Sequence, residues 1–356
     1  MNSIQTDTEA RSSTMAIMGD RWYPVLESVE LKHKPLGVER LGQRMVFWRT
    51  ADGHPHAQID RCPHLGAARS AGRISSDRLV CPFHGFEFDV SGACVHIPAN
   101  GKDSRAPKGM SAISFTLSEI HGFVWLWWGD AQDEYPEVPF FSLLETGWKH
   151  HTNIVDYPVH YTRAIENQLD VAHLPFIHAN TIGRGGKSFV DGPYVEADQQ
   201  GIRVWVTNYK DHGQSHRTQL ELAKEADGKE PSLNFQFPGT WLLNISPVLK
   251  NFIAFVPVNN HSTRYYLRLY HHVRIPIITI LFEKVMGICN LVILNQDKRV
   301  ILTQTPANSL DDNQDRFIGA DRAIIEYRRY LKNSLKLGEN AEHIDTDLNV
   351  TNEYRQ

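Results

Sequence analysis

Two short motifs in the first third of the chain each combine a cysteine with a histidine. Cys62 and His64 flank a proline, and Cys81 and His84 follow after sixteen intervening residues. A [2Fe–2S] cluster with mixed ligands needs two thiolates on one iron and two imidazoles on the other. Because imidazole is neutral, such a cluster has a higher reduction potential than an all-cysteine cluster. The pattern therefore predicts an electron-transferring [2Fe–2S] cluster held by these four residues.

The residues around both motifs are typical of tight loops that hold a cluster. Pro63 and Pro82 restrict the backbone directly after each cysteine. Gly66 and Gly85 permit a positive φ close to the cluster. The alternating stretch 86–90 then predicts a strand that leaves the second loop.

Other uses of the cysteines are a structural zinc site and a disulfide. Zinc fingers usually pair Cys with Cys and His with His, whereas here the two types alternate. A disulfide between Cys62 and Cys81 is disfavoured because no secretion signal is recognisable. We expect Cys94 and Cys289 to be inert buried thiols.

A second group of polar residues follows the middle of the chain. His173 and His178 are five residues apart with Pro175 between them, which is not the spacing of neighbours on a helix. We predict a helix over residues 162–172, with His178 on an irregular continuation. Two histidines with one carboxylate form the facial triad that holds an O₂-activating iron(II).

Asp170 precedes His173 by three residues, so on a helix both side chains would share a face. An ordinary helix pair is the simplest explanation of that spacing. The neighbouring Glu166 and Asn167 strengthen the interpretation as a metal site, since carboxylate and amide groups gather there.

Together the two groups resemble the Rieske non-heme iron oxygenases. The string Cys-Pro-His-Leu-Gly, followed by Cys-Pro-Phe-His-Gly-Phe, is characteristic of Rieske domains, and the second group indicates the oxygenase (alpha) component. The resemblance covers roughly residues 22–330 and is nearest in style to vanillate O-demethylase and the chlorophyllide and pheophorbide oxygenases. It implies an α+β fold: an all-β Rieske domain plus a helix-grip-like catalytic domain with an antiparallel sheet flanked by helices.

The resemblance also implies roles for individual residues. Asp170 would bridge the metal centres by hydrogen-bonding His84 of a neighbouring subunit and His173, within a homotrimer. Asn167 matches a position near the iron. The third iron ligand would be Asp297, which lies in a Gln-Asp segment after the apolar stretch 285–294, itself expected to be a buried helix. Less favoured carboxylates lie in a more polar stretch: Asp311, Asp312, Asp315 and Asp321.

Composition is ordinary for a two-domain globular protein: 356 residues, 41% hydrophobic and 22% charged. The net charge of −4 gives no indication of nucleic-acid binding. The stretch 275–294 is apolar but contains Glu283 and Lys284, so we expect no transmembrane segment and a cytoplasmic protein. Contact of this stretch with a membrane surface stays open.

The expected organisation is a disordered tail at 1–17, a Rieske domain at 18–130, a linker at 131–147 and a catalytic domain at 148–356. Strands are predicted at 44–49, 123–129, 152–158, 202–208, 232–237, 241–245, 252–256 and 265–272, and an amphipathic helix at 321–335. Pocket walls are expected from 189–205, 234–244 and 278–294. Phe235, Phe237 and Trp241 are candidate lining residues, although core packing is the simpler role. Arg184, Lys187 and Arg203 could bind an acidic substrate.

These features predict an oxygenase that uses O₂ to hydroxylate or oxidatively demethylate a small, largely apolar molecule. No flavin or nicotinamide fingerprint is present, so electrons would come ultimately from NAD(P)H through a separate ferredoxin or reductase. Alternatives are an arene cis-dihydroxylating dioxygenase, a non-enzymatic Rieske electron carrier and a zinc-stabilised binding module. The last two leave the second group of residues without a role.

Overall fold

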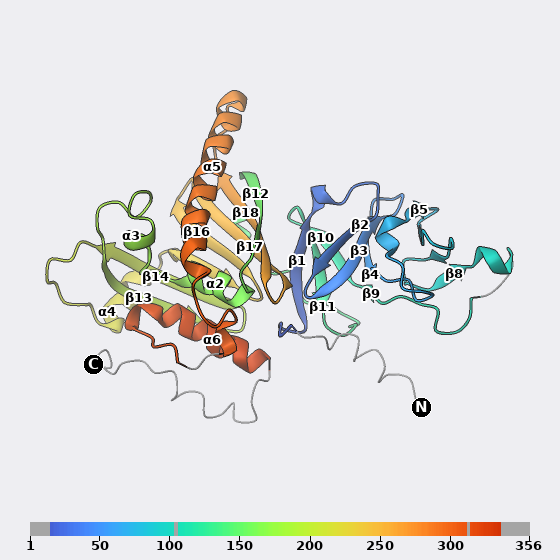
Figure 1. Ribbon diagram of the computed structural model, residues 1–356. Helices are drawn as coiled ribbons and strands as arrows, with labels where there is room; N and C mark the ends of the chain where they lie inside the picture. The colour runs from blue at the N-terminus through green and yellow to red at the C-terminus, as the bar shows by residue number, and fades with distance from the viewer. Residues whose placement is uncertain (1–14, 103–105, 312–313, 336–356) are drawn as a thin grey trace. The chain divides into compact units, whose positions relative to one another are not determined.

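The computed structural model describes residues 15–102, 106–311 and 314–335 (Figure 1). Most of the predicted N-terminal tail lies outside these ranges. The chain forms two compact units: unit 1 contains Met1–Val138 and Val256–Asn259, and unit 2 contains Pro139–Phe255 and Asn260–Gln356. The division after Val138 falls inside the segment predicted to be a linker.

Unit 1 consists of three small antiparallel sheets with the strand orders β1-β11-β10, β2-β3-β4-β9 and β5-β6-β7-β8. Its strands are β1 (Arg21–Glu27), β2 (Leu36–Arg40), β3 (Gln43–Arg49), β4 (Pro55–Ile59), β5 (Arg73–Ser75), β6 (Arg78–Val80), β7 (Glu87–Phe88), β8 (Cys94–His96), β9 (Ser114–Phe115), β10 (Leu117–Ile120) and β11 (Phe123–Trp128). The strands predicted at 44–49 and 123–129 are β3 and β11. Both are continuous apolar runs because they are buried on both faces.

Unit 2 is built on a seven-stranded antiparallel sheet with the order β12-β18-β17-β16-β15-β14-β13. The strands are β12 (Lys149–Tyr157), β13 (Phe189–Ala197), β14 (Gly201–Tyr209), β15 (Leu233–Gln236), β16 (Thr240–Ser246), β17 (Leu249–Asn259) and β18 (Ser262–His271). Six of the seven were predicted within a few residues, and β13 was missed. The first strand of the unit pairs with the last, and the other strands follow one another as a meander.

The helices of unit 2 are α2 (Tyr161–Leu169), α3 (Leu174–Ile177), α4 (Gln219–Ala226), α5 (Pro276–Ile301) and α6 (Arg322–Ser334). The helix predicted over 162–172 is too long, because α2 ends at Leu169. Asp170 has extended geometry with ψ of 124°, and its Oδ1 accepts a hydrogen bond from the N–H of Ala172 at 2.7 Å. The predicted buried helix at 285–294 is wrong in extent and burial, since α5 has 26 residues and a largely exposed surface.

A buried ion-pair network joins α2 to α6. The carboxylate of Glu166 accepts hydrogen bonds from Arg328 Nε at 2.7 Å and Nη2 at 2.9 Å, and from Arg163 Nη1 at 3.2 Å. Arg328 Nη2 also lies 2.6 Å from Asp315 Oδ2. These bonds hold the pKa of Asp315 below its usual range against the effect of burial, which alone would raise it. Glu166 and Asp315 therefore have structural roles here.

We predict that Arg328→Ala destabilises unit 2 strongly, because it leaves the Glu166 carboxylate buried and under-compensated. Loss of one partner of a buried ion pair costs about 3–5 kcal/mol. The matched control is Arg329→Ala, which removes an exposed arginine paired with Glu326 and should cost less than about 1 kcal/mol. Urea unfolding followed by circular dichroism measures both, and equal losses would contradict the structural role of the network.

Candidate metal centres

The two cysteine loops of unit 1 share one backbone geometry. In each loop the cysteine N–H donates to the carbonyl five residues later, at 2.8 Å for both Cys62 and Cys81. The glycine four residues after each cysteine donates back to the cysteine carbonyl, with distances of 2.9 Å from Gly66 and 3.1 Å from Gly85. Both glycines have positive φ, 77° and 71°, which explains the residue type at these positions.

The side chains of these loops form a donor set that fits a [2Fe–2S] cluster. Cys62 and Cys81 are buried and unbridged. His64 and His84 are exposed, and their ring centroids lie 4.8 Å apart. Burial and the neighbouring Cys81 raise the pKa of the Cys62 thiol, so a bound cation is needed to favour the thiolate. The histidine side of the cluster would face solvent, where electrons can enter and leave.

Arg69 is a residue of this centre that sequence reasoning missed. It is fully buried and its Nη1 donates to Gln58 Oε1 at 2.6 Å. Burial lowers the pKa of Arg69 to about 10, and the charges of Cys62, Asp60 and Cys81 oppose that shift. A buried cation close to both sulfurs stabilises the negative charge of the thiolates. A lone arginine between two loops gives no spacing signal in the sequence.

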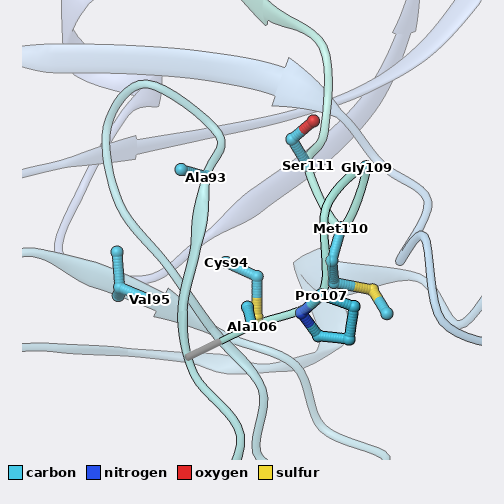
Figure 2. Close-up of a pocket in the computed structure, with 8 residues that line it drawn as sticks. All are labelled: Ala93, Cys94, Val95, Ala106, Pro107, Gly109, Met110 and Ser111. Carbon is cyan, nitrogen blue, oxygen red and sulfur yellow. The ribbon is translucent and has the colours of Figure 1, made fainter. Parts of the chain in front are cut away.

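Unit 1 also has a surface hollow of about 440 Å³, lined in part by Cys94 and Met110 (Figure 2). Cys94 is buried, its Sγ contacts the carbonyl of His96 at 3.7 Å, and burial raises its pKa. No charged or imidazole side chain lies among the described residues of the wall. The described wall thus has no donor set for a metal, and Cys94 is buried as predicted, while its inertness stays a prediction.

In unit 2, His173, His178 and Asp297 come together, with one ligand atom from each lying within 4.8 Å of the others. Asp297 Oδ1 lies 3.0 Å from His178 Nε2 and 3.7 Å from His173 Nε2. The three residues are the two-histidine-one-carboxylate set that sequence reasoning selected. This set binds non-heme iron(II) on one face and leaves other positions open.

Local structure explains how residues far apart in sequence meet. His173 and His178 flank the four-residue helix α3, so one turn of helix separates them. Pro175 lies in the first turn of α3, where a missing N–H costs nothing, instead of ending a helix as predicted. Asp297 projects from α5 with 2% of its side chain exposed. The expectation that it would follow the helix at 285–294 is wrong, since α5 continues to Ile301 and contains it.

The outer nitrogen of each histidine has an oxygen partner. His178 Nδ1 lies 2.8 Å from Gln296 Oε1, and that oxygen also accepts from Thr181 Oγ1 at 3.0 Å. A carbonyl oxygen accepts only, so His178 Nδ1 carries the proton and Nε2 faces the centre. His173 Nδ1 lies 3.4 Å from Asp170 Oδ2. Burial would raise the pKa of Asp170, but bonds from His173 and Ala172 lower it.

The centre fits a cation because it leaves buried polar atoms unsatisfied. Among the described residues, Asp297 Oδ1 faces both imidazole Nε2 atoms and is left without a well-aligned hydrogen bond, whereas the weakly held His173 Nδ1 lies on the outer side of its ring. Burial would lower the pKa of His178, yet bonds to Asp297 and Gln296 raise it overall. The protein thus gathers a carboxylate and two imidazoles in a site that a divalent metal would satisfy.

Asn167 and the less favoured carboxylates lie away from the triad. The Asn167 Nδ2 is buried with no partner among the described residues, and Asn167 does not line the cavity beside the triad. Asp321 accepts a hydrogen bond from the N–H of Ile318 near the start of α6. The described Asp311, Asp315 and Asp321 are outside the metal-ligand group, and Asp312 lies beyond the described ranges.

A cavity of about 570 Å³ adjoins the triad and is mainly apolar. Apolar side chains from β14 to β18 and α5 form most of its wall, and their members include Val206, Leu233, Trp241, Leu243, Ile253, Leu267, Met286, Ile293 and Leu294. The predicted segments 234–244 and 278–294 contribute, whereas 189–205 does not. Cys289 lines the cavity and is exposed, so its prediction as a buried thiol is wrong.

Phe235 and Phe237 lie in the core of unit 2 instead, where both pack against Tyr327. Arg184, Lys187 and Arg203 do not line the cavity. Arg203 pairs with Asp198 at 2.9 Å. Among the described residues, no Lys or Arg contributes to the wall.

Comparison with known proteins identifies the family. The family model "Rieske [2Fe-2S] domain" matches residues 21–116, and "Vanillate O-demethylase oxygenase C-terminal domain" matches residues 157–337. A Rieske cluster domain joined to such a C-terminal domain defines an oxygenase alpha subunit. The chain therefore belongs to the Rieske non-heme iron oxygenases, a family of oxidoreductases, within the group that includes the vanillate O-demethylase oxygenases.

Two relatives and one solved structure illustrate the similarity. A "Putative toluene-4-sulfonate monooxygenase system iron-sulfur subunit TsaM2" of Comamonas testosteroni is 31% identical over 59% of this chain and 62% of its own length. The vanillate O-demethylase oxygenase subunit of a Pseudomonas strain is 29% identical over 54% and 52%. The matches thus span between a quarter and about three fifths of the curated relatives' lengths. A dicamba monooxygenase structure shares the fold, with a TM-score of 0.71, 20% identity, and coverage of 91% and 99%.

We predict that His173→Ala removes one metal and leaves the other centre intact. The wild-type chain should contain about three iron and two acid-labile sulfide, with a reduced-cluster EPR signal. The variant should contain about two iron with unchanged sulfide and visible absorption. His212→Ala, on an exposed loop, is the matched control and should keep all three. Full iron content in His173→Ala would refute its assignment as a ligand, and zinc without sulfide would refute the cluster.

Proposed function

We propose that this chain is the oxygenase component of a monooxygenase that hydroxylates or oxidatively demethylates a small, uncharged, largely apolar molecule. The observation that carries the proposal is the His173, His178 and Asp297 triad at the wall of an apolar cavity. An iron held there would supply O₂ binding and reduction. The relatives named as demethylase and monooxygenase subunits support the same class of reaction.

The chain's own residues would orient the metal ligands and enclose the substrate. Gln296 and Thr181 orient His178, and Asp170 orients His173, so both Nε2 atoms point towards Asp297. The apolar wall would keep bulk water from the reacting carbon. If the attacked carbon is an O- or N-methyl group, the hydroxylated product collapses and releases formaldehyde; otherwise the alcohol persists.

We further propose that Asp170 connects the two kinds of centre in a homotrimer. Its carboxylate is 29% exposed and ionised, which leaves it able to accept a second imidazole, that of His84 from a neighbouring subunit. Electrons would reach the cluster from a separate ferredoxin or reductase and pass across this carboxylate. A short hydrogen-bonded bridge also fixes the distance between donor and acceptor.

The cavity wall supports an uncharged substrate. A buried anion would need a partner, and none of the described wall residues is a Lys or Arg. The polar recognition groups are amides instead. Asn251 and Asn290 donate to each other's Oδ1 at 3.3 and 3.2 Å, and each keeps one donor hydrogen and one lone pair. This pair suits a neutral carbonyl, ether or N–H group.

We expect Asp170→Asn to stop product formation while both metal centres stay filled. The amide keeps the size of the side chain but loses the charge that strengthens a hydrogen bond from the N–H of a metal-bound imidazole. Stopped-flow absorbance would show cluster oxidation by O₂ slowed at least tenfold, with unchanged iron and sulfide. Gln168→Glu, a cavity residue two positions earlier, controls for altered polarity. Normal turnover in Asp170→Asn would remove the bridging role.

Substrate charge gives the direct test of the proposed function. With a suitable reductase and O₂, neutral aryl or heteroaryl methyl compounds should have kcat/KM values at least about tenfold above carboxylate analogues, about 1.4 kcal/mol. Formaldehyde and alcohol assays distinguish demethylation from hydroxylation. Asn251→Arg should narrow or reverse the preference, whereas Arg203→Ala should not alter it. A preference of the wild type for the carboxylate would contradict the proposed substrate class.

A further inference from the structure

Helix α5 has an apolar surface that the catalytic role does not explain. An 18-residue window of it has a mean hydropathy of 2.1, yet only 22% of that window is buried. By length and composition the helix could cross a membrane. Core helices and signal sequences have the same composition, but a core helix is buried, and α5 begins at Pro276, far from the N-terminus. Its apolar surface therefore needs another explanation.

The N-terminal end of α5 has a broad exposed apolar face, and the polar Thr279 on its opposite side is buried. Figure 1 shows this end extending beyond the strands of the sheet. Its exposed side chains are Ile275, Ile277, Ile278, Ile280 and Leu281, and Ile277 is 81% exposed. At 100° per residue, Ile277, Ile278, Ile280 and Leu281 spread over about 160° of the helix circumference, on the side opposite the buried Thr279. An uncovered apolar face of this breadth indicates an apolar surrounding medium or an apolar partner.

A partner helix explains less of this surface. Ile278, Leu281, Val285, Ile288 and Val292 recur at spacings of three and four residues and could form a seam with another helix. However, Ile275 precedes the helix, and Ile280 lies about 120° around the axis from the centre of that seam. A second copy of the chain docked along the seam would leave these side chains in water, whereas a lipid phase would surround all of them.

The residues beside this end are those expected at a lipid headgroup layer. Arg274 and Lys284 are exposed, and exposed Lys149 pairs in register with His271 where β18 ends. The acidic Glu283 is bonded to His271 at 3.0 Å. Trp148 is half-buried, and its ring lies 4.0 Å from that of His272. Cations and a tryptophan next to an apolar segment are typical of a membrane interface.

We propose that the segment Ile275–Leu281, which is the N-cap and the first six residues of α5 and forms its tip, inserts into one leaflet of an anionic lipid bilayer. Six helical residues rise about 9 Å, which is less than the roughly 15 Å hydrocarbon depth of one leaflet. The helix does not span the bilayer, because Leu294, Asp297 and Ile301 are buried in unit 2. The attachment is monotopic, with the headgroups next to Arg274, Lys284 and Lys149.

This attachment suggests how substrate reaches the site, a step that rests on the proposed function. Met286, Cys289, Asn290 and Ile293 line the cavity and lie on α5 shortly after the tip. A molecule dissolved in the bilayer would therefore meet the cavity wall next to the point of insertion. We therefore expect the substrate to be soluble in lipid as well as uncharged.

Vesicle sedimentation tests the attachment without substrate or turnover. The full chain with its metals is mixed with vesicles of phosphatidylcholine alone or with added phosphatidylserine. We expect binding to the anionic vesicles, and Ile277→Asp or Leu281→Asp should weaken it more than tenfold, because a charge in the leaflet is costly. Leu220→Asp, at a 67% exposed position on α4, is the control and should bind like the wild type. Arg274→Glu should reduce only the preference for anionic vesicles.

Three outcomes would overturn the proposal. The wild type could stay in the supernatant with both vesicle types, or the tip variants could bind as well as the wild type. Alternatively, the tip variants could lower the mass in light scattering with no lipid binding by the wild type, which would assign the surface to a second copy. Unchanged iron and sulfide in every variant would show that the catalytic proposal is unaffected.

Discussion

The buried carboxylate of Asp297, placed between two imidazoles, is the constraint on which the catalytic unit depends. An ionised group with an unsatisfied oxygen in a protein interior is unfavourable unless a cation joins it. The surrounding residues place both imidazoles so that a bound cation would offset this unfavourable burial. The short helix α3 sets the spacing of His173 and His178, and Gln296 fixes the tautomer of His178. The site is therefore preorganised for a divalent metal.

The two metal centres meet opposite physical requirements. The cysteines of unit 1 are buried, but the histidines are at the surface, where an external donor can approach. The triad instead faces a mainly apolar cavity. Under the proposed function, electron transfer needs access and oxygen chemistry needs shelter from water, which would explain the use of two units. Asp170, partly exposed and ionised, is the residue suited to link them.

Helix α5 combines several roles along its length. Its last turns provide Asp297 and Gln296, its middle lines the cavity with Met286 and Asn290, and its first turns are exposed and apolar. The buried network around Glu166 fixes α2 against α6 and so holds the segment that leads to the histidines. A rigid base and an apolar tip on one helix would allow membrane contact without disturbing the metal ligands.

The sequence by itself indicated the donor types. Ligand types and spacing are local properties, so the cysteine and histidine pairs and most strands could be predicted from them, whereas Asp297 was selected through the resemblance to the Rieske oxygenases. Tertiary structure decided which groups meet. Pro175 lies in the first turn of α3 rather than ending a helix, and the buried Arg69 interacts electrostatically with both cysteines from a position with no motif. The sequence also did not decide which apolar segments are exposed. An apolar run has the same sequence pattern whether it is packed in a core or left uncovered, as in α5.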